Sequence, residues 1–334
     1  MFVIFIGLCI IPGMQIHLPH GAFLGNIDQF FQGFDPAQPD RLSITAVDRW
    51  MWLHPVALSM IASLAVKLLG ENITCQQITA RSGHYLESMG LFRFLKLESG
   101  MAISEHDPSG RFIPLTQIKN STELTKFITE MIPILHLMPQ QAEPIRYIVS
   151  ELVRNVLEHA QTQHGAILCA QYFKKSNTIR IGIADTGIGI RKSLSQSHDT
   201  SDDIDAIKLA MMPGVTGTTP REGGTALNAG AGLFFIKSIA YTNRNFFVIY
   251  SGTGMYKLLK KKETAGLILH ANPNMDRHSE NVHLSKWDGT VIGIDISLDS
   301  TSEFTTLLDL IRDTYSRAIR ERKEQRYKKQ ARFI

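Results

Sequence analysis

The order of predicted elements after residue 120 is the feature that most limits the possible folds of this chain. A cap-like Ser121 begins one helix, which Pro133 is expected to kink, and Pro144 is expected to open a second helix. Strand-like stretches follow at 165–173, 178–185, 244–252, 265–270 and 290–298, the first two joined by the short turn KKSN. Helices and strands in this order pack as layers, so the sequence predicts an α+β sandwich with helices on one side of a mixed or antiparallel sheet.

The first hundred residues show a different order of predicted strands and helices. Residues 16–97 alternate short strand-like and helical signals, which predicts a small α/β layer domain. The following stretch is polar and contains Gly100, Pro108 and Gly110, a composition typical of a linker. We therefore expect five parts: an apolar segment at 1–15, an α/β domain at 16–98, a linker at 99–118, the sandwich domain at 119–300 and a basic helical tail at 301–334.

Composition excludes several classes of protein. The chain has 334 residues, 44% of them hydrophobic and 20% charged, with a net charge of +4, as in a folded protein with two domains of ordinary size. Its three cysteines are far apart and odd in number, which fits neither a disulfide framework nor a zinc site. The apolar runs at 1–14 and 55–70 are shorter than a membrane span of about 20 residues. We expect a cytoplasmic protein without a membrane partner.

A polar stripe marks the second predicted helix. Within SELVRNVLEHA, residues 150–160, the side chains of Glu151, Asn155 and His159 are four residues apart and so share one face. A solvated helix face would give the same spacing. The stripe alone therefore indicates no chemistry.

Two glycine-rich stretches follow. In IADTGIGI, residues 183–190, Asp185 ends a strand, and glycines let the backbone approach a ligand closely; a tight turn with an Asp cap is the alternative. In NAGAGLFFIK, residues 228–237, Gly230 and Gly232 precede an apolar helix, whose N-terminus can hold phosphate. Glycines also open helices for packing reasons. Neither a dinucleotide fingerprint nor a P-loop is present.

Together these three motifs resemble the N box and the two glycine boxes of the GHKL superfamily, the ATP-binding module of gyrase, Hsp90-type chaperones, histidine kinases and MutL. WDGTVIGIDI, residues 287–296, resembles a later strand of that module. The resemblance implies a Bergerat-type α/β sandwich, with helices on one face of a mixed sheet, that binds ATP and Mg²⁺. It implies that Glu151 is the general base, that Asn155 binds Mg²⁺ and that Asp185 accepts from the adenine amino group. The remaining implied nucleotide contacts are Gly187, Gly189, Gly230, Gly232, Leu233 and Thr290.

The segment from Ile190 to Ala229 corresponds in this resemblance to a lid over the nucleotide. Thr216, Thr218 and Arg221 are its candidates for contacting the γ-phosphate, and His159 is a further nucleotide-binding candidate. The second box departs from the common GxGLGL pattern, because Phe234 and Phe235 follow Leu233. A histidine helix that could accept phosphate is missing, which argues against autokinase activity.

The N-terminal part loosely resembles a STAS-like domain through HPVALSMIASL and YLESMGLF. Fusion of such a domain to a GHKL module is similar to bacterial switching systems, so we expect a protein partner and consider a homodimer. The hypothesis is an ATPase whose lid closure regulates a partner; a serine kinase of the anti-sigma type, a histidine-kinase-like regulator and a module with structural ATP are the alternatives. The tail after Tyr315 has eight Lys or Arg and two Glu. It fits either nucleic-acid binding or a solvated helix.

Overall fold

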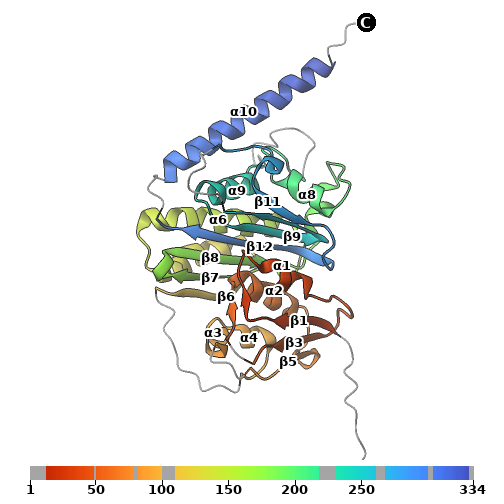
Figure 1. Cartoon of the computed structure of the whole chain (residues 1–334), viewed down its shortest axis with the longest axis vertical. Coiled ribbons are helices and arrows are strands. Elements are labelled where there is room, and N and C mark those ends of the chain that lie inside the picture. Colours follow the sequence, from red (N-terminus) through yellow and green to blue (C-terminus); the bar gives the residue numbers. More distant parts are fainter. Residues whose placement is uncertain are drawn as a thin grey trace, which may run out of the picture.

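The computed structural model describes residues 13–48, 50–78, 82–99, 110–217, 230–260, 268–299 and 304–330. Figure 1 shows a central sheet with helices α6 and α9 above it, the N-terminal strands and helices below it, and α10 extending away from the body. The predicted apolar segment at 1–15 lies outside the described residues up to Pro12. None of the described helices is long and apolar enough to cross a membrane.

The central sheet has seven described strands in the order β11-β10-β9-β12-β8-β7-β6. Every neighbouring pair is antiparallel, so the mixed sheet implied by the resemblance is wrong. The strands are β6 (Phe112–Ile118), β7 (Ala166–Phe173), β8 (Thr178–Ala184), β9 (Phe247–Gly252), β10 (Gly254–Leu258), β11 (His278–Asn281) and β12 (Trp287–Ser297).

Sequence patterns missed three of these strands. Strand β6 occupies the end of the predicted linker at 99–118 and forms an edge of the sheet. Strands β10 and β11 are short and have mixed polarity. The strand predicted at 265–270 lies outside the described residues up to Leu267, and residues 268–270 are not in a strand.

One face of the sheet is covered by helices that follow β6 in the chain. Their apolar sides and the sheet form one core, which includes Ile148, Leu152, Ile181, Ile236 and Ile294. These helices are α5 (Ser121–Lys126), α6 (Pro139–His159), α7 (Gly189–Leu194), α8 (Asp203–Ala210), α9 (Gly232–Thr242) and α10 (Phe304–Gln330).

One of the two proline predictions for this region, that Pro144 opens the second helix, is wrong. Helix α6 begins at Pro139, with Gln141 reaching back to the backbone N–H of Met138, so Pro144 lies inside the helix and does not open it. A proline this near the N-terminus removes only one N–H from the helix ladder. Pro133 lies in a short 3₁₀ turn, Ile132–Leu135, that follows a π turn.

The opposite face of the sheet is covered by α2 (Pro55–Ala65), all eleven residues of which are buried. Ser59 of α2 donates a hydrogen bond of 2.9 Å to the carbonyl of Gly182 in β8. A Cβ atom on Gly182 would lie 2.1 Å from the backbone N of Val56, so this glycine allows the helix to approach the sheet. Helices therefore cover both faces, because the N-terminal part supplies the second layer.

A small parallel sheet, in the order β1-β3-β5, packs on the other side of α2. Its central strand is β3; the STAS-like family of this part stays a prediction. The N-terminal elements are β1 (Met14–Leu18), β2 (Gly21–Ala22), α1 (Ile27–Gln32), β3 (Leu42–Ala46), β4 (Trp52–Leu53), β5 (Ile73–Cys75), α3 (Gly83–Ser88) and α4 (Leu91–Leu95).

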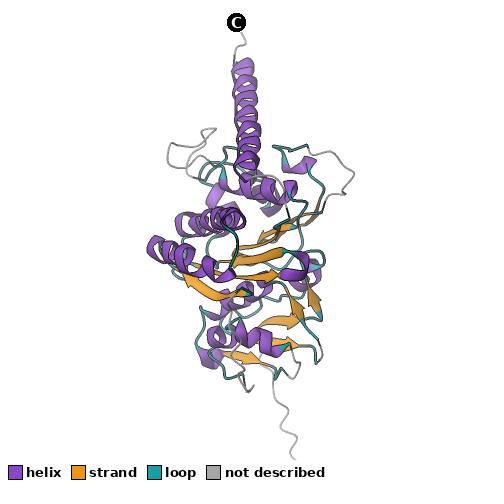
Figure 2. Ribbon diagram, turned by 90° about the vertical axis from the view of Figure 1, so that its left-hand side faces the viewer, coloured by secondary structure: helices purple, strands orange, loops and turns teal. Residues whose placement is uncertain are grey.

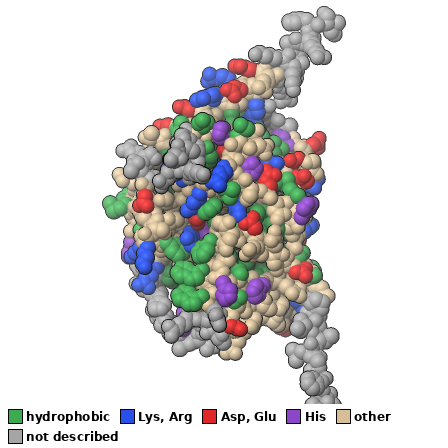
Figure 3. Space-filling model, viewed as in Figure 1, with side chains coloured by type: hydrophobic (Ala, Val, Ile, Leu, Met, Phe, Trp, Pro, Cys, Tyr) green, Lys and Arg blue, Asp and Glu red, His purple; other side chains and the backbone are tan. Residues whose placement is uncertain are grey.

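The basic tail forms the long helix α10, whose first half lies on α9 and α6. The ring of Tyr315 packs 6.2 Å from that of Phe234 and 6.1 Å from that of Phe235, both at the start of α9. The second half projects beyond the body, as Figures 1 and 2 show from two sides. Basic and acidic side chains alternate along this end of the molecule in Figure 3.

Candidate functional site

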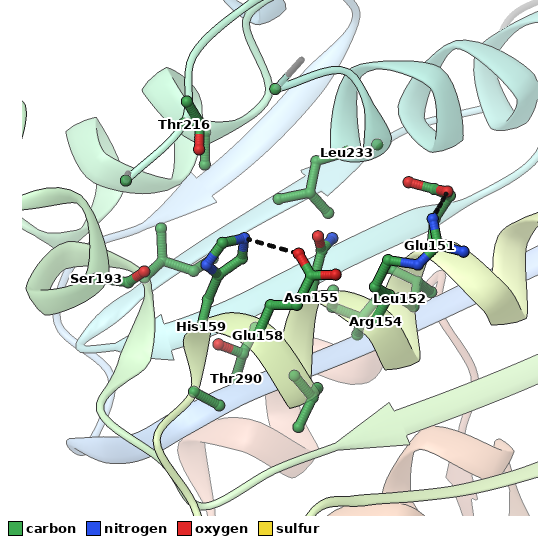
Figure 4. A pocket seen from close by; sticks show the side chains of 18 of the residues that line it. Glu151, Leu152, Arg154, Asn155, Glu158, His159, Ser193, Thr216, Leu233 and Thr290 are labelled. Carbon is green, nitrogen blue, oxygen red and sulfur yellow. Dashed lines mark hydrogen bonds and ion pairs between the residues drawn. The ribbon is translucent and has the colours of Figure 1, made fainter. Parts of the chain in front are cut away.

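A cavity of about 350 Å³ lies between α6, α7, the start of α9 and the ends of β8 and β12. This volume falls within the range of small-molecule sites. Ten of the predicted site residues line it: Glu151, Asn155, His159, Asp185, Gly189, Thr216, Gly230, Gly232, Leu233 and Thr290. Figure 4 shows the α6 side chains pointing into it, with Leu233 and Thr216 opposite and Thr290 on the sheet side.

The polar stripe of α6 forms one wall. The apolar residues of this helix face the core, which leaves Glu151, Asn155 and His159 along the cavity. One carboxylate oxygen of Glu151, Oε1, accepts a hydrogen bond of 3.1 Å from Nη1 of Arg154. Partial burial raises the pKa of Glu151, the Arg154 charge opposes this shift and Glu158 adds to it. The stripe is thus part of a site and not a solvated face.

His159 lies at the other end of this wall. Burial lowers the pKa of its imidazole, and the Glu158 carboxylate, 3.9 Å from Nε2, partly opposes that shift. Figure 4 shows the His159 ring between Ser193 and the Glu158 carboxylate. The lowered pKa favours a neutral imidazole at neutral pH, which can donate or accept a hydrogen bond but adds no full charge.

Asp185 is on the floor of the cavity, directly after β8, and only 2% exposed. Burial raises the pKa of its carboxyl group to about 7, although hydrogen bonds with the backbone of Gly187 and Thr290 lower it. Oδ1 accepts from the N–H of Gly187 at 2.8 Å. The backbone of Asp185 is also fixed, because its N–H donates to the Thr290 carbonyl and its carbonyl accepts from Trp287 Nε1.

Residues missed by the sequence motifs fix this floor. Gly289 has φ of +108°, and a Cβ there would lie 2.2 Å from the Asp185 carbonyl oxygen. Ser251 donates to the Gly289 carbonyl at 2.7 Å and accepts from the N–H of Ile190 at 3.0 Å. The glycine in WDGT was the available signal for Gly289, whereas nothing in the sequence marks Ser251.

The four predicted glycines have different structural roles. Gly187 does not line the cavity; a Cβ there would lie 2.1 Å from the carbonyl oxygen of Ala160, so this glycine permits close contact with the end of α6. Gly189 and Gly230 have positive φ, +76° and +62°, a conformation that favours glycine. At Gly232 a Cβ would lie 2.8 Å from Glu151 Oε2, which places the start of α9 against the α6 wall.

The predicted lid is only partly described. Thr218 and Arg221 lie outside the described residues, so their roles stay predictions. The described part contains α7 and α8, and α8 is anchored because Asp203 accepts from the N–H and the hydroxyl of Thr253. Thr216 is 5% exposed and lines the cavity. Helix α8, which lies within the segment predicted as a lid, buries Ile204 and Ile207.

The rest of the lining is mainly apolar and was not predicted. Leu152, Val156, Ile183, Leu194, Val215 and Ile292 supply this surface, and a flat aromatic ligand such as a purine base suits it. Arg154, Glu158 and Ser193 add polar groups. In the sequence, only their position next to the N box and the predicted lid could have identified these three residues as part of the lining.

The side chains that line the cavity fit a magnesium ion that is bound jointly by the protein and by the phosphates of a nucleotide. The Asn155 amide lines the cavity near Gly232, and its oxygen atom is of the hard type that binds Mg²⁺. The described residues contain no group of three His, Cys, Asp or Glu side chains that could hold a metal by themselves. A site with one or two protein ligands is typical for Mg²⁺ bound with a nucleotide.

Comparison with known families agrees with this geometry. Residues 116–244 match the family model of the histidine kinase-like ATPase domain. The matched stretch contains α6, Asp185 and the start of α9, but neither Thr290 nor the N-terminal part. No curated protein matches the chain. The family match supports a GHKL-type ATPase domain and ATP binding in it.

Proposed function

We propose that the cavity binds Mg-ATP and that the protein hydrolyses it to ADP and phosphate. The observation that carries this proposal is the distribution of polar groups along one cavity. Asp185 and Thr290 lie at the sheet end beside apolar side chains, and Glu151 and Asn155 lie beside Gly232 at the N-terminus of α9. A purine with an exocyclic amine fits the first end, and phosphates fit the second.

Each residue has a role in this proposal. The Asp185 carboxylate accepts a hydrogen bond from the adenine amino group, and backbone N–H groups at Gly230–Gly232 donate to phosphate oxygens. Asn155 supplies an oxygen ligand to Mg²⁺, which neutralises phosphate charge. Glu151 takes a proton from the attacking water. At the same time the water oxygen bonds to the γ-phosphorus, and the bond between the γ-phosphorus and the β,γ-bridging oxygen breaks.

Nucleotide binding also acts on two anchors of the predicted lid, Gly214 within it and Gly230 directly after it. The N–H of Gly214 donates to the carbonyl of Gly230 at 2.9 Å, and the segments next to both residues line the cavity. A ligand between α6 and these anchors contacts both sides, so nucleotide binding shifts the lid toward a closed state. This change is how we propose that the protein regulates a partner.

ATP turnover by the purified protein tests the proposal. Replacement of the base in Glu151→Gln is expected to lower kcat by about 10²- to 10⁴-fold while calorimetry still detects ATP binding. Glu143→Gln is the matched control, because Glu143 is exposed on the same helix and does not line the cavity. Absence of nucleotide binding by the wild-type protein would exclude the proposal.

Phosphotransfer to a partner is the second candidate. Glu151 lies at the cavity rim, where the Arg154 side chain beside it is 53% exposed, so a hydroxyl of another protein can reach this carboxylate. The carboxylate would then take the proton of a serine hydroxyl in place of water. Radiolabel from γ-labelled ATP that appears on a partner, with little free phosphate, identifies this reaction.

A further inference from the structure

The cavity has an unusual balance of charge for a phosphate site. Its described lining includes three carboxyl groups, on Glu151, Glu158 and Asp185, but Arg154 is its one Lys or Arg. Two of these carboxyl groups, Glu151 and Glu158, lie on α6 with Arg154. An additional phosphate brings further negative charge to this wall, so the position of the one guanidinium decides how well the described site tolerates it.

Arg154 is close to the expected phosphate end. Its Nη1 donates to Oε1 of Glu151 at 3.1 Å. The other oxygen of Glu151, Oε2, lies 2.8 Å from where a Cβ of Gly232 would be, at the first residue of α9. Figure 4 shows the guanidinium and the Glu151 carboxylate together at this end of the α6 wall. A phosphate at the N-terminus of α9 would therefore lie beside this ion pair.

The ion pair is also easy to exchange. The Arg154 side chain is 53% exposed, and that of Glu151 is 23% exposed. A pair this open to solvent contributes little to stability. Phosphate offers the guanidinium two parallel hydrogen bonds and more negative charge than one carboxylate oxygen does.

We propose that Arg154 distinguishes ATP from ADP, by leaving Glu151 and binding the terminal phosphate. The exchange has a second consequence, because it releases the Glu151 carboxylate to accept a proton from water. This inference rests on the proposed function, which places the phosphates at the start of α9. It adds a specificity residue outside the motif positions.

Calorimetry with ADP and with the non-hydrolysable β,γ-imido analogue of ATP, both with Mg²⁺, tests the inference. The wild-type protein is expected to bind the analogue more tightly than ADP. In Arg154→Gln this preference should fall by about 10- to 100-fold, the value of one or two charge-assisted hydrogen bonds, while ADP affinity changes by less than about twofold. Arg154→Lys should recover part of the preference, since it keeps the charge but loses the bidentate geometry.

Arg146→Gln is the matched control, because Arg146 is exposed on α6 and does not line the cavity. An unchanged preference in Arg154→Gln, or equal losses for ADP and the analogue, would overturn the role of Arg154 and leave the proposed function intact. A wild-type protein that binds both ligands equally would also overturn that role alone. A wild-type protein that binds neither ligand would overturn both proposals.

Discussion

We expect the buried carboxyl group of Asp185 to make nucleoside binding depend on pH. Burial raises its pKa to about 7, so the group is mostly ionised at pH 8 and mostly protonated at pH 6. Only the ionised form is purely an acceptor for the adenine amino group; the protonated form carries a hydroxyl that donates. Adenosine is the suitable ligand for the measurement, because it has no phosphate that titrates in this range.

The size of the effect follows from the pKa. If the ionised form binds, the affinity below pH 7 falls by a factor approaching ten for each pH unit, and the total loss from pH 8 to pH 6 is about tenfold. Fluorescence or calorimetric titration at half-unit steps measures the profile. Asp185→Asn should bind weakly at every pH, with a flat profile, because its amide does not titrate. His159→Gln is the control for the histidine of the wall, and its profile should keep the wild-type shape.

The same carboxyl group makes the stability of the ligand-free protein fall as pH rises, whereas the affinity for adenosine is expected to rise. Its pKa is raised from 3.8 in the unfolded chain to about 7, so the stability it contributes is present at low pH and lost as pH rises from about 4 to 7. Ionisation at pH 8 costs the folded state up to about 4 kcal/mol at 1.36 kcal/mol per pKa unit. Asp185→Asn should therefore unfold at higher denaturant at pH 8 while binding adenosine more weakly. Equal wild-type affinity for adenosine at pH 6 and pH 8 would refute this reasoning.

Two further predictions concern the contact between α2 and the sheet. Gly182→Ala places a methyl group against the backbone of Val56 and should cost about 1–3 kcal/mol or more in urea unfolding; Gly33→Ala, whose added Cβ meets only atoms at 3.5 Å or beyond, should be near neutral. His54→Ala removes the side-chain cap of α2 and the 3.2 Å contact with Asp295, and we expect a loss of about 2–4 kcal/mol. Burial lowers the pKa of His54 against the opposing effect of Asp295, so its neutral form stabilises the fold above pH 6.5 and that stability is lost on acidification. The decline should be weaker in the variant, and an identical acid profile in both proteins would contradict this assignment.

The sequence was most informative where residue type and chemistry are tightly linked. Spacing along α6 put three polar groups on one face, and the structure places all three in one cavity. The strand before Asp185 and the helix after Gly232 were likewise predicted from period and composition. Such features are local, so neighbouring residues are enough to define them.

Non-local features were less accessible. The edge strand β6 pairs with β7, more than forty residues later in the chain, and its own residues, FIPLTQI, lack strict alternation. Ser251 enters the site only because β9 lies beside β12, which brings its hydroxyl to the carbonyl of Gly289. The sequence also assigned a packing position, Gly187, to the ligand, since a glycine needed for close contact with Ala160 has no distinct signature.

The fully buried helix α2 links these local and non-local features. Its residues are buried on every side because one sheet lies on each side of the helix, so the division into an N-terminal domain and an ATPase domain divides a common core. Strand β8 contacts α2 at Gly182 on one face and ends at Ala184, directly before Asp185 in the cavity. A displacement of α2 therefore moves the strand that positions the Asp185 carboxylate, which we propose to bind adenine. Through this path a ligand of the N-terminal part could alter nucleotide affinity, and Gly182→Ala, measured for adenosine binding as well as stability, examines that coupling.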